Sequence, residues 1–285
     1  MTSNNTAYKR EETDPAMNDG CCKNEESQSG KSDPFPAATG KIRIRFLGTG
    51  DNFGSGGRLQ ACIHVDTEKS RFLIDCGASS LIAMKRGGIG SAAIDAILIS
   101  HLHGDHFGGI PFFILDAQLI SRRQIPLVIA GPPGLIRRVQ EAMEVFYPGS
   151  SRIERKFSID FIEMAEGETT CVGDLSVFPV RVIHGSGAPP YALKIQCAGK
   201  IIAYSGDTEW TEALRTVADG ADLFICESYF FDKPMKNHLN YRTLMAHKAE
   251  LGCRRLIITH PGEDLLNRRD EIELDIAEDG MELIL

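Results

Sequence analysis

The pattern of apolar and polar residues changes sharply near residue 41. Residues 2–40 are rich in Ser, Asn, Glu, Lys and Pro and almost free of β-branched apolar residues, so they cannot bury enough surface to offset their ordering entropy. From Lys41 to Leu47 polar and apolar residues alternate, which is typical of a half-buried strand. We therefore predict a disordered tail over residues 1–40 and one folded domain over residues 41–285.

Short apolar runs bounded by Gly, Pro and polar residues recur along the folded part, and they predict strands. The strands are expected at residues 41–47, 60–66, 71–75, 94–100, 127–130, 157–162, 175–183, 191–197, 200–204, 223–226 and 254–259. Helices are expected at residues 79–86, 107–122, 135–146, 209–218 and 241–251. Hairpins mixed with strand–helix–strand units indicate a mixed α/β domain whose sheets are covered by helices.

Composition narrows the class of protein. The chain has 285 residues, 42% of them hydrophobic and 25% charged, which is ordinary for a soluble globular protein. No apolar run approaches the roughly 20 residues that span a bilayer. The net charge of −8, with no basic block, makes long nucleic acid an unfavourable partner but leaves room for a small anionic substrate held by metal.

Two features of the sequence favour a cytoplasmic location. The start of the chain lacks the basic and apolar regions of a signal peptide. The eight cysteines are scattered without a CxxC pair, and four of them lie in apolar, strand-like stretches, as expected of buried, reduced thiols. These four are Cys62, Cys76, Cys197 and Cys226.

Four candidate metal ligands fall within six residues, directly after the predicted strand at 94–100. They are His101, His103, Asp105 and His106. Imidazole and carboxylate groups suit zinc, iron or manganese, and Gly104 permits tight backbone geometry. A lone histidine after a strand is usually structural, but four such groups on one turn are hard to explain by packing alone. We predict a metal site here.

Four further candidates lie at the ends of other predicted strands, where side chains can converge. They are Asp75, His184, Asp207 and His260. Taken singly, each has an ordinary explanation: Asp207 could cap the next helix, and His260 could be a turn residue before its proline. Together with the first group, they form a ligand set for two metals.

These motifs, in this order, resemble the metallo-β-lactamase fold superfamily over about Lys41 to the C-terminus. The stretches Phe46-Leu-Gly-Thr49 and Tyr204-Ser-Gly-Asp-Thr208 resemble the RNase Z and phosphodiesterase branch. The resemblance implies an α+β fold, a four-layer αβ/βα sandwich with two metals at one edge between the sheets. It also implies a homodimer.

The resemblance further implies a role for each candidate residue. The first metal would be held by His101, His103 and His184, and the second by Asp105, His106 and His260. Asp207 would bridge the two, and Asp75 would orient a ligand from outside the metal shell. Asp105 and Asp75 would also serve catalysis. Both ions would be divalent, with zinc expected and manganese or iron as alternatives.

His238, in Asn237-His-Leu-Asn240 ahead of a predicted helix, is a further catalytic candidate. In RNase Z-like proteins a histidine at this place, upstream of the last ligand strand, assists the phosphate reaction. The alternative is an ordinary histidine on a surface loop. His64 within a predicted strand and His247 on a predicted helix fit structural roles better.

The function implied by the resemblance is hydrolysis of a phosphodiester bond in a small or short substrate, through a metal-bridging hydroxide. A hydrolase of a lactone, thioester or other carboxylic ester would have the same metal core. An RNase Z-type endoribonuclease normally carries a Gly/Pro-rich arm, and no such insertion separates His106 from His184.

Two other classes fit less well. A flavodiiron oxidoreductase would have glutamate in place of His103 and a flavodoxin domain. A metal-stabilised binding protein without activity would be expected to lose a bridging or water-activating group, and all are present. The natural substrate, the metals and the oligomeric state stay open at this point.

Overall fold

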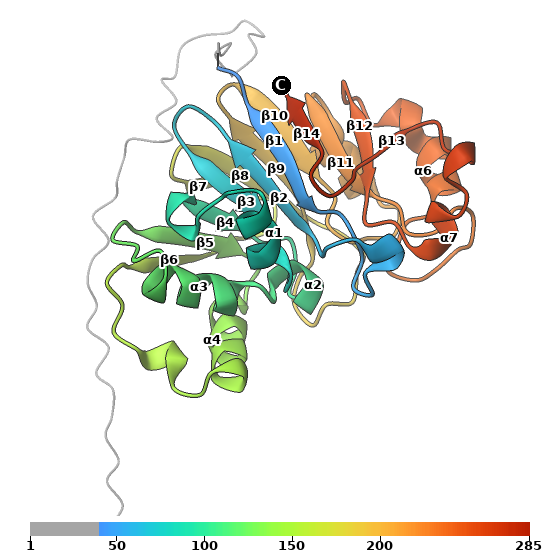
Figure 1. Cartoon of the computed structure of the whole chain (residues 1–285). Helices are drawn as coiled ribbons and strands as arrows, with labels where there is room; N and C mark the ends of the chain where they lie inside the picture. Colours follow the sequence, from blue (N-terminus) through green and yellow to red (C-terminus); the bar gives the residue numbers. More distant parts are fainter. Residues whose placement is uncertain (1–39) are drawn as a thin grey trace, which may run out of the picture. The chain divides into compact units, whose positions relative to one another are not determined.

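The computed structural model describes residues 40–285, so the predicted tail lies outside the described residues apart from Gly40. Within that range the chain forms two seven-stranded sheets (Figure 1). The first contains, in spatial order, β14 (Glu282–Ile284), β1 (Arg43–Gly48), β2 (Cys62–Asp66), β3 (Arg71–Ile74), β4 (Ala96–Leu98), β5 (Leu127–Gly131) and β6 (Ile159–Glu163). The second contains β13 (Asp275–Ile276), β12 (Leu256–Thr259), β11 (Leu223–Glu227), β10 (Lys200–Tyr204), β9 (Tyr191–Cys197), β8 (Leu175–Arg181) and β7 (Thr170–Val172).

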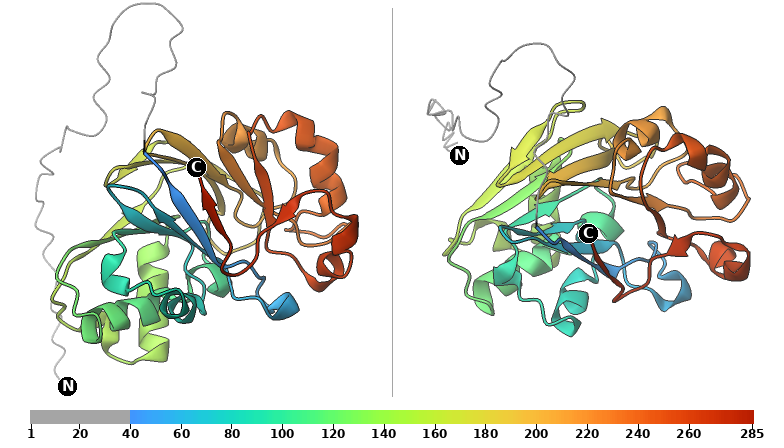
Figure 2. Two further views of the ribbon diagram at one scale, coloured as in Figure 1. Left: turned by 45° about the horizontal axis from the view of Figure 1, so that its top comes forward. Right: turned by 90° about the horizontal axis from the view of Figure 1, so that it is seen from above.

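Helices cover the outer face of each sheet (Figure 2). Those associated with the first sheet are α1 (Ser80–Arg86), α2 (Gly104–Phe107), α3 (Ile110–Leu119) and α4 (Leu135–Phe146). Those associated with the second are α5 (Glu212–Ala218), α6 (Tyr241–His247) and α7 (Glu263–Leu266). Short 3-10 turns lie at Ser55–Gly57, Ser91–Ala93, Ser150–Arg152, Lys248–Glu250 and Arg269–Glu271. The result is the four-layer αβ/βα sandwich of an α+β protein, as predicted.

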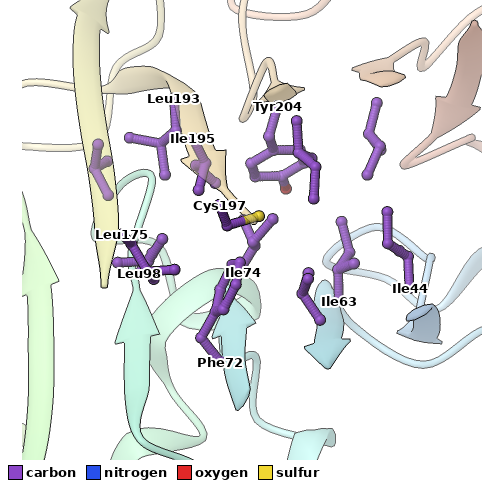
Figure 3. Packing of buried hydrophobic residues seen from close by; sticks show 14 of the residues in the cluster. Ile44, Ile63, Phe72, Ile74, Leu98, Leu175, Leu193, Ile195, Cys197 and Tyr204 are labelled. Carbon is purple, nitrogen blue, oxygen red and sulfur yellow. The ribbon is translucent and has the colours of Figure 1, made fainter. Parts of the chain in front are cut away.

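Alternation along the strands explains the layers. In β3, Phe72 and Ile74 point into the space between the sheets, whereas Leu73 belongs to the cluster beneath the helices. Side chains of the second sheet, among them Leu193 and Tyr204, pack in the same cluster as Phe72 and Ile74 (Figure 3). Because central strands are buried on both faces, they appear in the sequence as continuous apolar runs.

Strand direction determines where the chain can place a site. Strands β3 to β6 run parallel to one another, as do β10 to β13. β8 and β10 are both antiparallel to β9, so they run in the same direction. The segments that follow these strands therefore leave each sheet at the carboxyl ends of its parallel strands, where such sheets commonly bind ligands.

The predicted elements are largely confirmed, with differences at their ends. The helix expected at 107–122 is the shorter α3, because Gly108 and Gly109 separate it from the one-turn helix α2. The strand expected at 94–100 is reduced to β4, and β7, β13 and β14 have no predicted counterpart. The four cysteines expected in the core are buried. No helix among residues 40–285 is long and apolar enough to cross a membrane.

Candidate metal centre

The predicted ligands come from the segments that directly follow four strands. His101 and the turn after it follow β4, His184 follows β8, Asp207 follows β10 and His260 follows β12. The structure brings all seven predicted ligands together in two adjacent groups. The groups are His101, His103 and His184, and Asp105, His106, Asp207 and His260. In each, the ligand atoms all lie within 4.8 Å of one another.

The first group consists of three imidazoles whose nitrogens converge. The Nε2 atom of His184 lies 3.0 Å from Nδ1 of His103. His184 donates its Nδ1 proton to the backbone oxygen of Asn237 over 2.8 Å. This hydrogen bond fixes the tautomer that leaves Nε2 free for a cation, as is usual for histidine ligands.

The second group combines imidazoles with carboxylates. The Nε2 atoms of His106 and His260 are 3.3 Å apart, and Nε2 of His260 lies 3.2 Å from Oδ2 of Asp105. His106 comes from the one-turn helix α2, while His260 lies 154 residues further along the chain. Residues distant in sequence therefore make one compact ligand set.

Asp207 contacts both groups. Its Oδ2 atom lies 3.8 Å from Nε2 of His101 and 3.8 Å from Nε2 of His184. Its Oδ1 atom lies 3.3 Å from Nε2 of His106. Asp207 therefore lies within 4 Å of ligand atoms in both groups. Asp207 does not cap the following helix, because the N-cap of α5 is Thr211.

Asp75 lies behind this cluster and orients it. Its carboxylate accepts hydrogen bonds from Nδ1 of His106 over 2.7 Å and from the backbone N–H of Ser100 over 2.8 Å. The hydroxyl of Ser100 also donates to Asp75 and lies 3.1 Å from Nδ1 of His101. Asp75 and His260 both have a φ of 58°. This left-handed backbone turns the chain sharply after β3 and β12, at a cost in strain.

Close backbone contact holds the two loops beside Asp75. A Cβ atom on Gly77 would lie 2.2 Å from the backbone oxygen of Asp105, and one on Gly109 would lie 2.2 Å from that of Gly77. The backbone N–H of Cys76 donates to the oxygen of His106 over 2.6 Å. Only glycine fits at positions 77 and 109 while the ligand turn stays in this place.

The pKa values reflect a buried, carboxylate-rich site. Burial lowers the pKa of His101 well below its usual value, because it disfavours the cationic form. Burial also acts to lower the pKa of His260, but Asp207 and Asp105 outweigh it and raise that pKa to about 9. Burial acts to lower the pKa of His106 as well, but Asp207, Asp105 and Asp75 outweigh it and raise that pKa above its usual value. The carboxylates thus favour positive charge beside His106 and His260.

A divalent cation fits the donor set. Among the described residues, no group forms a hydrogen bond with the buried atoms Nε2 of His101 or Oδ1 of Asp207. A buried polar atom without a partner costs about 1–3 kcal/mol, and coordination would satisfy both atoms. Imidazole nitrogens with carboxylate oxygens are the ligands of zinc and of similar divalent metals. The fold and this cluster together indicate a metal site.

His238 lies beside the cluster rather than on a remote surface loop. Its ring centre is 5.1 Å from that of His184 and 5.8 Å from that of His260. Its Nδ1 atom lies 3.1 Å from Oε2 of Glu227, a fully buried carboxylate. Burial acts to lower the pKa of His238, but the hydrogen bond to Glu227 raises it.

Glu227 is a site residue that the sequence analysis missed. It accepts a hydrogen bond from the backbone N–H of Thr208, and its own N–H donates to the hydroxyl of Ser205 over 2.8 Å. It stands at the end of β11, between β10 and β12. The strand-end criterion that selects Asp207 and His260 would therefore have selected Glu227 as well.

A cavity of about 340 Å³ opens over the cluster. Its wall includes His238 and five of the predicted ligands, His103, Asp105, His184, Asp207 and His260. A volume of this size is at the lower end of the range for small-molecule sites, roughly 300–1,000 Å³. These five potential ligands thus line a space that opens to solvent.

The four-layer sandwich with a His/Asp cluster at the strand ends defines a protein of the metallo-β-lactamase fold. The family model described as Anti-Pycsar protein Apyc1 matches residues 42–279, and the chain belongs to this family.

Three known proteins are similar to this chain over most of its length. The Ribonuclease Z of Lachnoclostridium phytofermentans is 26% identical over 271 residues, which covers 77% of this chain and 87% of that enzyme. The metallo-β-lactamase fold protein YhfI of Bacillus subtilis superimposes with a TM-score of 0.68 at 19% identity, over 85% of this chain and 99% of that one. A diphosphatase from the PhnP family superimposes with a TM-score of 0.67 at 20% identity, over 85% and 97%. The likeness to the two structures concerns the fold.

Proposed function

We propose that this protein is a hydrolase that uses two divalent cations to cleave a phosphodiester bond. The observation that carries the proposal is the contact of Asp207 with both ligand groups, since a carboxylate in that position can join two ions. One ion would be held by His101, His103 and His184, and the other by Asp105, His106 and His260. When bound, the ions supply Lewis-acid polarisation of the phosphoryl group and a water that ionises near neutral pH.

The remaining site residues would orient a ligand or the attacking water, or donate a proton to the leaving oxygen. Asp75 would hold the ring of His106 so that Nε2 faces the ion, because it accepts the proton on Nδ1. Asp105 would direct its carboxylate toward the attacking water as well as toward an ion. His238, held by Glu227 through Nδ1, would present Nε2 to the leaving oxygen and donate a proton to it.

Support for phosphorus chemistry comes from the relatives, which are named Ribonuclease Z and diphosphatase. The description of the family as an anti-Pycsar protein names a biological role rather than a reaction. Phosphodiester hydrolysis is the reaction that we propose for that role.

The decisive experiment is metal analysis of the purified protein combined with a substrate screen. We expect about two ions per chain, zinc or alternatively manganese or iron, and turnover of phosphodiesters, including cyclic nucleotides. A sulfate ester and a lactone are the control substrates, which show whether turnover is specific to phosphodiesters. Faster turnover of the lactone or of a thioester would assign the alternative, a carboxylic ester hydrolase on the same core.

A second candidate is an RNase Z-type endoribonuclease, which the Ribonuclease Z relatives favour. Two observations weigh against it. The alignment with the Ribonuclease Z of Lachnoclostridium phytofermentans spans 271 positions, which is more than 77% of this 285-residue chain can fill. That enzyme therefore has residues without a counterpart in this chain. The chain is also acidic, with a net charge of −8, which opposes contacts to an RNA backbone. Cleavage of a precursor tRNA at rates above those for small diesters would reverse this preference.

The homodimer and the cytoplasmic location also belong to the proposal. The homodimer rests on the family resemblance, and the cytoplasmic location rests on the scattered cysteines without a CxxC pair. Light scattering of the purified protein measures the first, and fractionation of cells measures the second.

A further inference from the structure

Phe53 is an exposed aromatic residue that borders the cavity over the metal cluster. Its side chain is 81% exposed, the highest value among the large apolar residues of the described range. Single exposed apolar side chains are common and need no explanation. Phe53 differs because it lines the same cavity as His103, Asp207 and His238.

The loop that carries Phe53 is held in one shape. Oδ1 of the buried Asp51 accepts hydrogen bonds from the backbone N–H of Phe53 over 3.1 Å and of Ser55 over 2.9 Å. Oδ2 accepts the hydroxyl of Ser55 over 2.7 Å. At the far side of the loop, the backbone N–H of Gly56 donates to Oε1 of Glu263 over 2.9 Å. The backbone that positions the Phe53 ring is thus held by hydrogen bonds, although the ring itself is exposed.

Tyr229 lines the same cavity as Phe53, and its ring centre lies 4.9 Å from that of His238. Burial together with Asp51 raises the pKa of the Tyr229 hydroxyl, so it remains a donor. Phe53, Tyr229 and His238 therefore border the same space over the metal cluster.

A second apolar side chain lines the cavity. Met235, between β11 and α6, is 45% exposed and belongs to the cavity wall together with Lys236. An aromatic ring and a thioether side chain suit a flat, polarizable group. The ammonium group of Lys236 adds positive charge to a wall that would face a phosphate.

On the basis of the proposed function, we propose that Phe53 is a specificity-determining residue that stacks on a flat aromatic ring carried by the non-leaving side of the phosphodiester. The cavity of about 340 Å³ takes a phosphate and one substituent of that kind. Substrates with such a ring are preferred over those with an alkyl group of equal size. Met235 contacts the same substituent.

The test uses three diesters with one leaving group, the benzyl, cyclohexylmethyl and methyl esters of p-nitrophenyl phosphate. The metal-loaded enzyme is expected to show the highest kcat/KM for the benzyl ester. Phe53→Ala should lower kcat/KM for that ester by roughly tenfold, the scale of a lost aromatic stack, and leave the methyl ester within about twofold. Phe53→Trp should retain the preference. Val145→Ala, at a 76% exposed position on α4, is the matched control and should change nothing.

Binding provides a second readout that does not depend on turnover. Calorimetry of benzyl phosphate and methyl phosphate with the metal-loaded protein should show tighter binding of the benzyl compound, lost in Phe53→Ala. A benzyl preference that survives in Phe53→Ala, or cyclohexylmethyl and benzyl esters of equal kcat/KM, would overturn the inference. Absence of turnover for all three diesters would instead refute the proposed function, and the calorimetry would still decide the role of Phe53.

Discussion

The Nε2 atoms of His106 and His260 face one another across 3.3 Å, although 154 residues separate them in the chain. Nδ1 of His106 is already engaged by Asp75. Both Nε2 atoms also approach carboxylate oxygens of Asp105 and Asp207. The two imidazole nitrogens and the two carboxylates lie so close together that they require a shared cation or shared protons.

Removal of metal should destabilise the fold. A bound ion stabilises the native state by RT ln(1 + [L]/Kd), about 4 kcal/mol at a thousandfold excess over Kd. We expect a chelator to lower the melting temperature and added zinc or manganese to restore it. His106→Ala should respond less to either treatment. Equal melting temperatures with and without chelator would contradict a metal bound to the folded chain.

Asp207 should affect both ions. We expect Asp207→Ala to lower the metal content toward one equivalent or less, because its carboxylate touches both groups, whereas His103→Ala should affect only one. Elemental analysis after reconstitution with zinc and with manganese measures the content. Asp174→Asn, at an exposed turn, is the control. Less than one equivalent in the unmodified protein would refute the dinuclear site.

Asp75 should act through His106 rather than by contact with the ions. Asp75→Asn removes the anionic partner of Nδ1 and is expected to weaken metal affinity about 10–100-fold, as is typical for partners of histidine ligands. Competition with a chromogenic chelator measures this affinity. Unchanged affinity would show that the ring of His106 is positioned by packing alone.

His238 should serve the leaving oxygen. We expect His238→Ala to lower kcat by about two orders of magnitude with metal content unchanged, since a positioned imidazole contributes roughly 10²–10⁴-fold to such a step. The loss should be smaller for bis(p-nitrophenyl) phosphate, whose leaving group needs little proton help.

The comparison between esters separates the possible roles of His238. Equal losses on alkyl and aryl esters would assign His238 to stabilising charge on the phosphoryl oxygens instead. His247→Ala, outside the cavity, is the control. No loss on either ester would return His238 to an ordinary loop histidine.

His64 should make the fold acid-sensitive. This buried residue of β2 has no hydrogen-bond partner for either ring nitrogen among the described residues. Burial lowers its pKa from 6.5 to about 4. Its contribution to stability is present above pH 6.5 and is lost as the pH falls toward 4, because the unfolded chain takes up the proton first.

The variant His64→Leu removes that proton uptake. Between pH 6.5 and 4 the unmodified protein should lose about 3 kcal/mol more unfolding free energy than the variant, from a pKa difference of about 2.5 at 1.36 kcal/mol per unit. Urea unfolding across this range measures the difference. Parallel pH profiles of the two proteins would contradict the lowered pKa.

The strand-end ligands could be recognised from the sequence because their signal is local. An apolar run predicts a strand by its own pattern, and a histidine or aspartate directly after it occupies the only place where parallel strands present side chains to a site. This rule predicts Asp207 and His260, whereas His101 is predicted from its cluster with His103, Asp105 and His106 on one turn after a strand. The alternation predicted sheets covered by helices, and the family resemblance implied the four-layer sandwich.

Only the tertiary structure decided what the remaining groups contact. Glu227 appears in the sequence as the last residue of a buried strand, and its link to His238 depends on how β11 lies between β10 and β12. Phe53 stands in a glycine-rich loop with no periodic pattern, and its place at the cavity results from the hydrogen bonds of Asp51. The hydrogen bonds of Asp51 to Phe53 and Ser55 are local, but the place of this loop over the ligands, like the pairing of Glu227 with His238, arises only once the strands have packed together, and no spacing rule encodes it.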